Sequence, residues 1–386
     1  MKRLGVNDDD LELFHALDAF AQETLAPKAA ALDEQAASAS CHLAGLARMG
    51  MLGLTIPERY GGIDASPASI VLANVAIARA CAATCSLLGA HYLGTDAVLI
   101  GGNEAQKQKY LPGACATDLA AFALTEPNGG SNPADLRTKA TRATENDVEG
   151  YRIQGSKQFI SNADEAKWIV VYAKTDSSAK GVKGISAFIV ERDTKGLSVS
   201  PPERTMGIRA GFAHALSLDC FVPSAQRLGE EGTGFITAMR VLDNSRLDVA
   251  ANCIGIAEAA YNAAVDYVKT RHVGGEPLSA KQGIQWTIAD MRTRLEAAWA
   301  LALQAAEKRR LFTQTGEKYS MEVSLAKLYA SEMAAYVTDA ALQLHGGYGY
   351  TRDLPLERYC RDARIMRIYE GSSEIQRTII ARHALM

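Results

Sequence analysis

The sequence has no long apolar run and no concentration of charge of one sign, and each absence excludes a class of protein. No stretch approaches the roughly 18 apolar residues that a membrane-spanning helix needs. The net charge is −3, with acidic and basic residues interspersed, so a nucleic-acid-binding surface is not expected. The first ten residues carry charges without an apolar segment behind them, unlike a signal peptide. We therefore expect a cytoplasmic protein without a membrane span.

The sequence also lacks the spacing of a metal site. Its 7 cysteines are scattered, and the 7 histidines form no ligand pattern with them. Cys81 and Cys85 stand one helical turn apart in an alanine-rich stretch, where two buried thiols are the simpler interpretation. An odd number of cysteines fits a reducing compartment, and no metal is predicted.

The periodicity of apolar residues divides the chain into three parts. The 386 residues are too many for one compact core. The first part is helical and rich in alanine, the middle part has short β-rich runs between turn residues, and helical periodicity then returns. In the last part, the segments 283–312, 317–346 and 362–383 are predicted as long helices beside a first one. The predicted fold has an N-terminal α-helical domain (1–116), a middle antiparallel β-barrel or sandwich (117–230) and a C-terminal four-helix bundle (231–386).

Glu370 is the candidate catalytic residue. It stands between the apolar Ile368-Tyr369 step and Gly371. Apolar neighbours raise the pKa of a carboxyl group towards that of a general base, and glycine lets a substrate approach the backbone. A lone glutamate near a C-terminus is usually a surface residue, so this interpretation depends on other segments.

Two of these segments are suited to a flat, phosphorylated cofactor. Residues 122–132 predict a strand that runs into a Pro-Asn-Gly-Gly turn, whose bare N–H groups can cradle a pyrophosphate. In the predicted strand 155–162, Phe159 and Ser161 share a face, where a ring could be packed and hydrogen-bonded. A plain tight turn, and a core phenylalanine beside a surface serine, would look the same.

Two further segments offer charged and amide groups. Asp243 and Arg246 are three residues apart on a predicted helix, which alone predicts an ion pair. Arg271 with Gln282 is followed by Gln343, Gly346 and Gly347. Arginine offers a fixed fork to a phosphate, and glutamine offers a donor together with an acceptor.

The order and spacing of these segments resemble the acyl-CoA dehydrogenase family over essentially the whole chain. The matching stretches begin at Ile56 (IPERYGG), Leu124 (LTEP), Phe159 (FISN), Met206 (MGIR), Ala289 (ADM), Gly346 (GGYGY), Pro355 (PLER) and Ile368 (IYEG). The resemblance implies a flavoenzyme of fatty acid β-oxidation with non-covalent FAD. Such an enzyme desaturates an acyl-CoA between Cα and Cβ and passes electrons to an electron-transfer flavoprotein.

The resemblance also implies a role for each matched residue. Glu370 would remove the α-proton, the β-hydride would pass to flavin N5, and the Glu370 N–H with a ribityl hydroxyl would stabilise the enolate. Some branches of the family carry a glutamate base just before the arginine of the third segment. Ser245 stands at that position here, so the role returns to Glu370.

The remaining matched positions resemble cofactor and substrate contacts. The flavin and pyrophosphate loop would comprise Phe122, Leu124, Thr125, Gly130 and Ser131, with Phe159 and Ser161 as a wall beside the ring. The FAD of a neighbouring subunit would be held by Arg271, Gln282, Gln343, Gly346 and Gly347, with Ser372 and Glu374 at the cofactor after the base. Substrate contacts would come from Ser131, Asp243, Ser245, Arg246 and Gly371. A shared FAD implies a homo-oligomer, most often a tetramer.

Some positions depart from the family pattern. The usual Ala-Gly-Ser-Asp is Gly-Gly-Ser-Asn over residues 129–132. Phe159 replaces the more frequent tryptophan, Ser161 replaces threonine, and Gly274 stands where an aromatic residue is usual. These departures indicate a less typical member.

The acyl group and the fate of the electrons stay open in the sequence. The pocket floor is expected from residues 85–97, where Leu87, Leu88, Tyr92 and Leu93 are apolar and no Arg or Lys could pair with a dicarboxylate. This favours short or medium acyl chains, branched ones included. The alternatives are an oxygen-reactive acyl-thioester oxidase, a dehydrogenase of carrier-protein thioesters, and a non-catalytic scaffold that keeps the fold.

Overall fold

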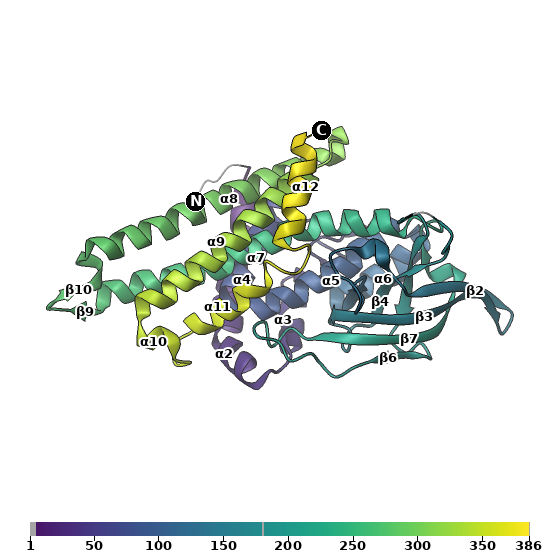
Figure 1. Ribbon diagram of the computed structural model, residues 1–386, viewed down its shortest axis with the longest axis horizontal. Helices are drawn as coiled ribbons and strands as arrows, with labels where there is room; N and C mark the ends of the chain where they lie inside the picture. The colour runs from purple at the N-terminus through teal and green to yellow at the C-terminus, as the bar shows by residue number, and fades with distance from the viewer. Residues whose placement is uncertain (1–4, 180, 386) are drawn as a thin grey trace.

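In the computed structural model, which describes residues 5–179 and 181–385, helices precede and follow a large β-sheet (Figure 1). The N-terminal helices are α1 (Asp8–Phe20), the π-helical turn η1 (Ala21–Leu25), α2 (Ala26–Gln35), α3 (Leu43–Arg48), α4 (Pro67–Ala80), α5 (Ala82–Gly101) and α6 (Glu104–Ala116). The prediction of a helical first part is confirmed. None of the described helices combines the length and apolar character that crossing a lipid bilayer requires.

The strands of the middle part form one sheet. They are β1 (Ala120–Ala123), β2 (Lys139–Glu145), β3 (Val148–Ser161), β4 (Trp168–Lys174), β5 (Ile185–Glu191), β6 (Leu197–Val199), β7 (Ala213–Pro223) and β8 (Arg227–Leu228). The order is β6-β7-β3-β2-β4-β5-β8, and β1 pairs with β4. Most pairs are antiparallel, as predicted, but β4 pairs in parallel with both β1 and β2. The parallel pairing brings the end of β1, where the glycine turn begins, beside the middle of the sheet.

Strand β4 is buried on both faces of the sheet. Trp168, Val170 and Tyr172 belong to a core that includes residues of α5, α6 and α7. Ile169 and Val171 alternate with them and pack with residues of β3 and β7. This double burial explains why the segment is apolar at every position rather than at every second one.

A buried histidine joins the helical part to the sheet. His91 of α5 accepts a hydrogen bond at Nδ1 from the N–H of Ala120, over 3.1 Å, and its Nε2 lies 3.0 Å from the carbonyl oxygen of Leu52. Burial lowers the pKa of His91 to about 4, so the ring is neutral and Nε2 is the donor. The contact fixes α5 against the first strand.

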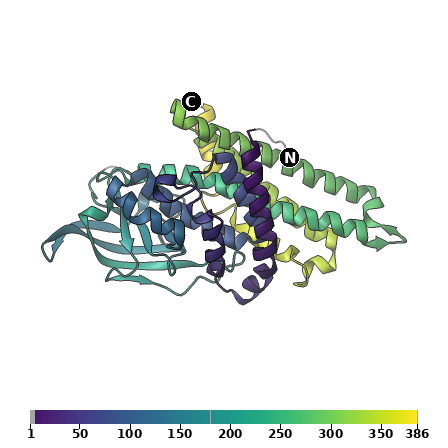
Figure 2. The same cartoon turned by 180° about the vertical axis from the view of Figure 1, so that it is seen from behind.

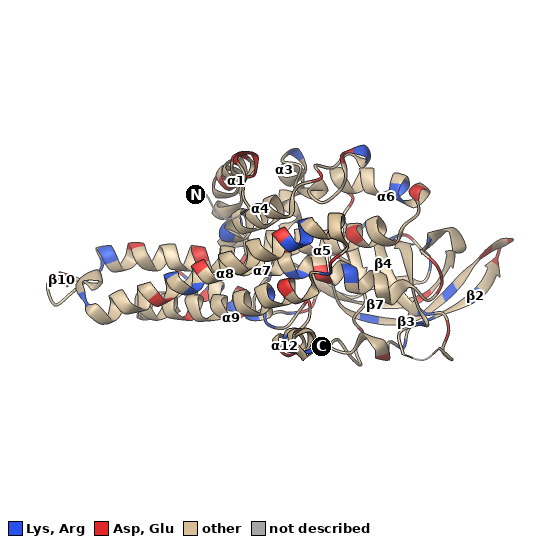
Figure 3. Ribbon diagram, turned by 90° about the horizontal axis from the view of Figure 1, so that it is seen from above, with Lys and Arg blue, Asp and Glu red and all other residues tan. Residues whose placement is uncertain are grey.

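The C-terminal part contains three long helices and a series of short elements. The helices are α7 (Gly234–Thr270), α8 (Gln282–Thr315), α9 (Ser320–His345), α10 (Gly347–Tyr350), α11 (Leu356–Ile365) and α12 (Ser373–Leu385), and the hairpin β9 (His272–Val273) with β10 (Glu276–Pro277) joins α7 to α8. Helix α4 packs against α7 and α8, and α1 packs on α4, on the side that Figure 2 shows. Acidic and basic residues are interspersed along the helices (Figure 3).

The prediction of one continuous helix over 362–383 is wrong. Helix α11 ends at Ile365 and α12 begins at Ser373, with a turn over 366–372 between them. Glu370 has φ +54° and Gly371 has φ +86°, and consecutive left-handed residues cannot continue a right-handed helix. Glu370 therefore lies in a turn between two helices and not within a continuous helix.

Candidate active site

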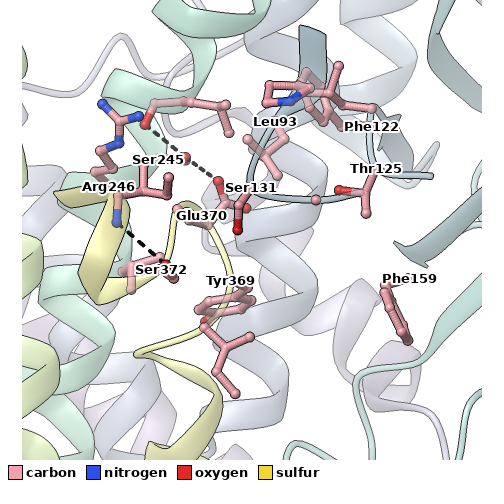
Figure 4. A pocket seen from close by; sticks show the side chains of 18 of the residues that line it. Leu93, Phe122, Thr125, Ser131, Phe159, Ser245, Arg246, Tyr369, Glu370 and Ser372 are labelled. Carbon is pink, nitrogen blue, oxygen red and sulfur yellow. Dashed lines mark hydrogen bonds between the residues drawn. The ribbon is translucent and has the colours of Figure 1, made fainter. Parts of the chain in front are cut away.

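A cavity of about 830 Å³ lies where α5, α7, the loop after β1, the end of β3 and the 366–372 turn meet. Twelve of the predicted site residues line it: Phe122, Leu124, Thr125, Gly130, Ser131, Phe159, Ser161, Ser245, Arg246, Glu370, Gly371 and Ser372. They come from segments up to 250 residues apart in the chain. Figure 4 labels Phe122, Ser245 and Glu370 among them. The candidate base and the candidate cofactor loop therefore share one cavity.

The turn that carries Glu370 is held by its backbone carbonyl groups. Lys327 of α9 donates from Nζ to the carbonyl oxygen of Gly371 over 2.7 Å. The side-chain amide of Gln376 donates to the same oxygen over 2.9 Å and to the Glu370 carbonyl oxygen over 3.2 Å. Lys327 and Gln376 are both fully buried. The position of the base is therefore fixed by two side chains outside the cavity lining.

The Glu370 carboxyl group is surrounded by one hydroxyl and two cations. Burial raises its pKa above the ordinary glutamate value, while the hydrogen bond from Ser245 and the charges of Lys327 and Arg246 oppose the rise. Ser245 Oγ lies 2.7 Å from Glu370 Oε2 (Figure 4). A carboxylate with a raised pKa that stays accessible from a cavity is suited to accept a proton from a carbon acid.

Arg246 and Asp243 form the ion pair that their spacing predicts. The Arg246 guanidinium is buried and donates to Asp243, whose other oxygen accepts a hydrogen bond from Ser320 over 2.5 Å. Arg246 lines the cavity, whereas Asp243 lies behind it. Asp243 is thus placed to orient Arg246, and its predicted contact with substrate stays a prediction.

The glycine loop after β1 is anchored by a buried ion pair. Lys157 of β3 donates to Glu126 over 2.9 Å and to the Leu124 carbonyl oxygen over 3.2 Å. Glu126 also accepts from the Arg137 and Thr138 N–H groups, over 2.6 and 2.9 Å. Because both charges are buried and several donors meet the carboxylate, the start of the loop is held rigidly.

Phe159 reaches the cavity through a bulge in β3. The pairing of β3 with β7 shifts between Lys157 and Ile160, and Phe159 has φ +58°. The simple strand alternation that we predicted is therefore interrupted, although Phe159 and Ser161 both line the cavity. The Phe159 ring is 63% exposed, which is unusual for an aromatic side chain on a β-sheet and leaves a flat apolar face beside the Thr125 and Ser161 hydroxyls. These residues fit a planar ring system that carries polar edge atoms.

Comparison with known proteins settles the family. Models described as the N-terminal, middle and C-terminal domains of acyl-CoA dehydrogenase match residues 7–118, 121–220 and 232–385. The chain belongs to the acyl-CoA dehydrogenase family. It is therefore an oxidoreductase of a family of flavoproteins, and the predicted fold class is confirmed.

Relatives with named activities match this acyl-CoA dehydrogenase family member over nearly its whole length. It is 41% identical to an acryloyl-CoA reductase (NADH) of Anaerotignum propionicum, covering 95% of this chain and 92% of that one. It is 40% identical to a short-chain-specific acyl-CoA dehydrogenase of Clostridium acetobutylicum, covering 94% of each. The structure of butyryl-CoA dehydrogenase from Megasphaera elsdenii superposes with a TM-score of 0.94 at 36% identity and covers both chains completely.

The predicted residues that lie outside the cavity form a second group in this family member. Arg271 begins the β9–β10 hairpin region and stacks over Tyr348 of α10, with 5.8 Å from its guanidinium carbon to the ring centroid. Residues Gln282, Gln343, Gly346 and Gly347 lie at the adjoining ends of α8, α9 and α10. Figure 1 shows this end of the helices far from the sheet. Glu374 is exposed on α12 and does not line the cavity.

The expectation for the pocket floor is partly wrong. From residues 85–97, the residues that line the cavity are Ser86, Gly89, Ala90 and Leu93, whereas Leu87, Leu88 and Tyr92 belong to the helical core. The wall formed by α5 is therefore made mostly of small residues.

Lys327 and Asp248 were not among the predicted site residues. Lys327 interrupts a stretch of small and apolar residues in α9, and Asp248 stands at the start of such a stretch in α7; the helical period places both on the buried face. A charged residue on the apolar face of a helix was the signal that could have identified both.

Proposed function

We propose that this protein removes hydrogen from Cα and Cβ of a short-chain acyl-CoA thioester and forms the trans-2-enoyl-CoA. The observation that carries the proposal is that Glu370 shares one cavity with the Thr125–Ser131 loop and the exposed ring of Phe159. A base alone could serve many reactions. A base that faces a site for a planar redox cofactor is suited to dehydrogenation.

Glu370 is the proposed base for the α-proton. Its raised pKa lies nearer to neutral pH than that of an ordinary glutamate, which increases its strength as a base. Within the described chain, the backbone N–H of Glu370 donates to no protein acceptor. It is therefore free to donate to the thioester carbonyl oxygen, where negative charge develops as the α-proton leaves.

FAD is the cofactor that the cavity lining fits. Phe159 would pack against its ring system, and the hydroxyls of Thr125, Ser131 and Ser161 would hydrogen-bond its polar edges, since all four side chains line the cavity. When bound, FAD supplies the acceptor for the hydride that leaves Cβ. The protein's own groups hold the thioester, exclude water and take the α-proton.

The second group of residues supports a shared cofactor site. Arg271, Gln282 and Gln343 lie too far along the bundle to line the cavity of their own chain, so we infer that they contact FAD of a neighbouring copy. This arrangement requires a homo-oligomer, and a tetramer is the proposed form. An electron-transfer flavoprotein is the proposed acceptor of the electrons.

Anaerobic reduction of the purified protein tests the function. The protein should carry a yellow flavin that bleaches when butyryl-CoA is added, with crotonyl-CoA as the product. Glu370→Gln should keep the flavin and lower the bleaching rate by about 10²- to 10⁴-fold, the usual contribution of a general base. The matched control is Glu317→Gln, which removes an exposed carboxylate at the start of the α8–α9 connection. A Glu370→Gln rate within a few-fold of wild type would refute the assignment.

The same experiment separates the alternatives. Reduced flavin that reoxidises rapidly in air without an acceptor protein would support an oxygen-reactive oxidase. Bleaching by a carrier-protein thioester but not by its CoA counterpart would support a carrier-protein substrate, and a colourless protein would support a scaffold. The relative named acryloyl-CoA reductase raises the question whether this protein oxidises or reduces its thioester. Consumption of NADH with acryloyl-CoA, with no bleaching by saturated thioesters, would favour reduction.

A further inference from the structure

One wall of the cavity carries polar side chains that the proposed reaction does not use. Asp248 and Asn252 of α7 follow Ser245 by three and seven residues, so all three lie on one face of the helix. Ser86 lines the cavity from α5. The neighbouring lining positions Leu93, Leu242 and Val249 are apolar, as a wall for an alkyl chain would be.

Asp248 has hydrogen-bonding capacity left over. It is 5% exposed, and its Oδ1 accepts from the side-chain amide of Asn74 over 3.1 Å. Among the described residues, its Oδ2 accepts no hydrogen bond and no cation forms an ion pair with it. Burial raises the pKa of Asp248 to about 8, with Arg309 opposing the rise and the negative charges of Asp96 and Glu370 adding to it. Because Asp248 lines the cavity, a carboxyl oxygen without a protein donor is available to a ligand there.

The orientation of this polar wall is fixed from behind. Asn74 of α4 holds Asp248, and the thiol of Cys85 donates to the side-chain oxygen of Asn252 over 2.6 Å. Cys85 also lies 3.4 Å from the Asn74 carbonyl oxygen, which links the two contacts. The four residues therefore form one braced network that presents Asp248 at a defined place.

Distance along α7 places Asp248 near the acyl chain rather than near the thioester. Ser245 contacts the carboxylate that would take the α-proton, so it marks the level of Cα. Asp248 is three residues further, which is about 4.5 Å along the helix axis. A group on the acyl chain two or three bonds beyond Cβ can therefore reach the Asp248 carboxyl group.

We propose that this cavity selects short acyl thioesters whose chain carries a hydrogen-bond donor, a hydroxyl or an amine, that donates to Asp248. This inference rests on the proposed function, because Glu370 defines the thioester end. An unsubstituted alkyl chain leaves the Asp248 oxygen without a partner. A chain that ends in a carboxylate brings a further acidic group and no donor to Asp248, and Arg246, the lining cation on the same helix, is already paired with Asp243.

Four thioesters of equal chain length test the selection: valeryl-, 5-hydroxyvaleryl-, 5-aminovaleryl- and glutaryl-CoA, each freshly prepared. The measurement is kcat/KM for anaerobic flavin reduction of the holoenzyme. At least one donor-bearing chain should exceed valeryl-CoA by about tenfold or more, the usual effect of a buried hydrogen bond on a binding equilibrium. Comparison of 5-hydroxyvaleryl-CoA with 5-aminovaleryl-CoA shows whether the cavity prefers a neutral or a charged donor. Valeryl-CoA equal to or better than both donor-bearing chains would overturn the proposal.

Variants of Asp248 assign the selection to this side chain. Asp248→Leu keeps a similar volume without polar atoms and should remove the preference while retaining reduction by valeryl-CoA. Asp248→Asn keeps an acceptor oxygen and should retain a preference for the hydroxyl but lose one for the amine, so it serves if the leucine variant does not fold. An unchanged preference in both variants would overturn the role of Asp248. If none of these thioesters, nor butyryl-CoA, bleaches the flavin, the proposed function itself fails.

Discussion

Ser245 Oγ lies 2.7 Å from Glu370 Oε2 and 3.1 Å from the carbonyl oxygen of Leu242. A serine hydroxyl has one proton and can also accept hydrogen bonds. It can donate to an ionised Glu370. When Glu370 holds the proton, the serine can instead accept from the carboxyl group and donate to Leu242. Ser245 can therefore position Glu370, the proposed base, in both of its protonation states.

Ser245→Ala is expected to lower kcat and to shift the acidic limb of the pH profile only slightly. Both states of Glu370 lose a partner, and the ionised state loses the stronger hydrogen bond by about 1 kcal/mol. The acidic limb of kcat/KM should therefore move to higher pH by less than about one unit, because one unit corresponds to about 1.4 kcal/mol. Stopped-flow pH profiles with bound flavin measured in parallel check this. A limb that moves to lower pH would contradict the contact.

Lys327→Met is expected to move the acidic limb of kcat/KM further than Ser245→Ala does. Lys327 is buried, anchors the Gly371 carbonyl oxygen, and its positive charge lowers the pKa of Glu370. Without that charge the pKa of Glu370 rises, so Glu370 stays protonated to higher pH and the limb should move up by about one unit or more. Lys318→Met, at an exposed position before α9, is the matched control. A profile unchanged in Lys327→Met, with lowered kcat alone, would show that Lys327 acts only through the turn.

Gly371→Ala tests the geometry of the turn. A Cβ at Gly371 would lie 2.6 Å from the side-chain nitrogen of Gln376, and the backbone has φ +86°. The substitution should displace the 366–372 turn and reduce kcat by at least about tenfold, since small misplacements of a catalytic group are costly. Flavin content should change little, whereas the thermal unfolding midpoint should fall, because alanine is strained in the left-handed region. Wild-type kcat in this variant would contradict the requirement for a left-handed residue.

Lys157→Met tests the anchor of the cofactor loop. It leaves Glu126 as an uncompensated buried charge, which should lower the free energy of unfolding by about 3–5 kcal/mol. The double variant Lys157→Met with Glu126→Gln should recover part of the loss, because the charge is then removed. Urea denaturation of the two variants, with exposed Lys139→Met as control, measures the difference. A double variant less stable than Lys157→Met would contradict this account.

Local patterns determined much of this protein. The helical period predicted the N-terminal helices and the three long C-terminal ones, and alternation between apolar runs and turns predicted the sheet. The sequence also identified Glu370 and the glycine loop as candidates, and the structure brings both to one cavity. These features depend on residues that are near one another in the chain, so a linear pattern contains them.

Only the tertiary structure decided how distant segments meet. Ser245 and Glu370 are 125 residues apart, and their contact depends on α7 packing beside a turn that helical periodicity did not predict. The polar wall of Asp248 and the anchor formed by Lys327 likewise arise from packing between α4, α5, α7 and α9. Burial and proximity set the pKa of these groups, and neither is a property of a residue's neighbours in sequence. The sequence by itself determined the family and identified Glu370 as the candidate base. The packing of the helices decided the environment of Glu370 and the polar wall of the cavity.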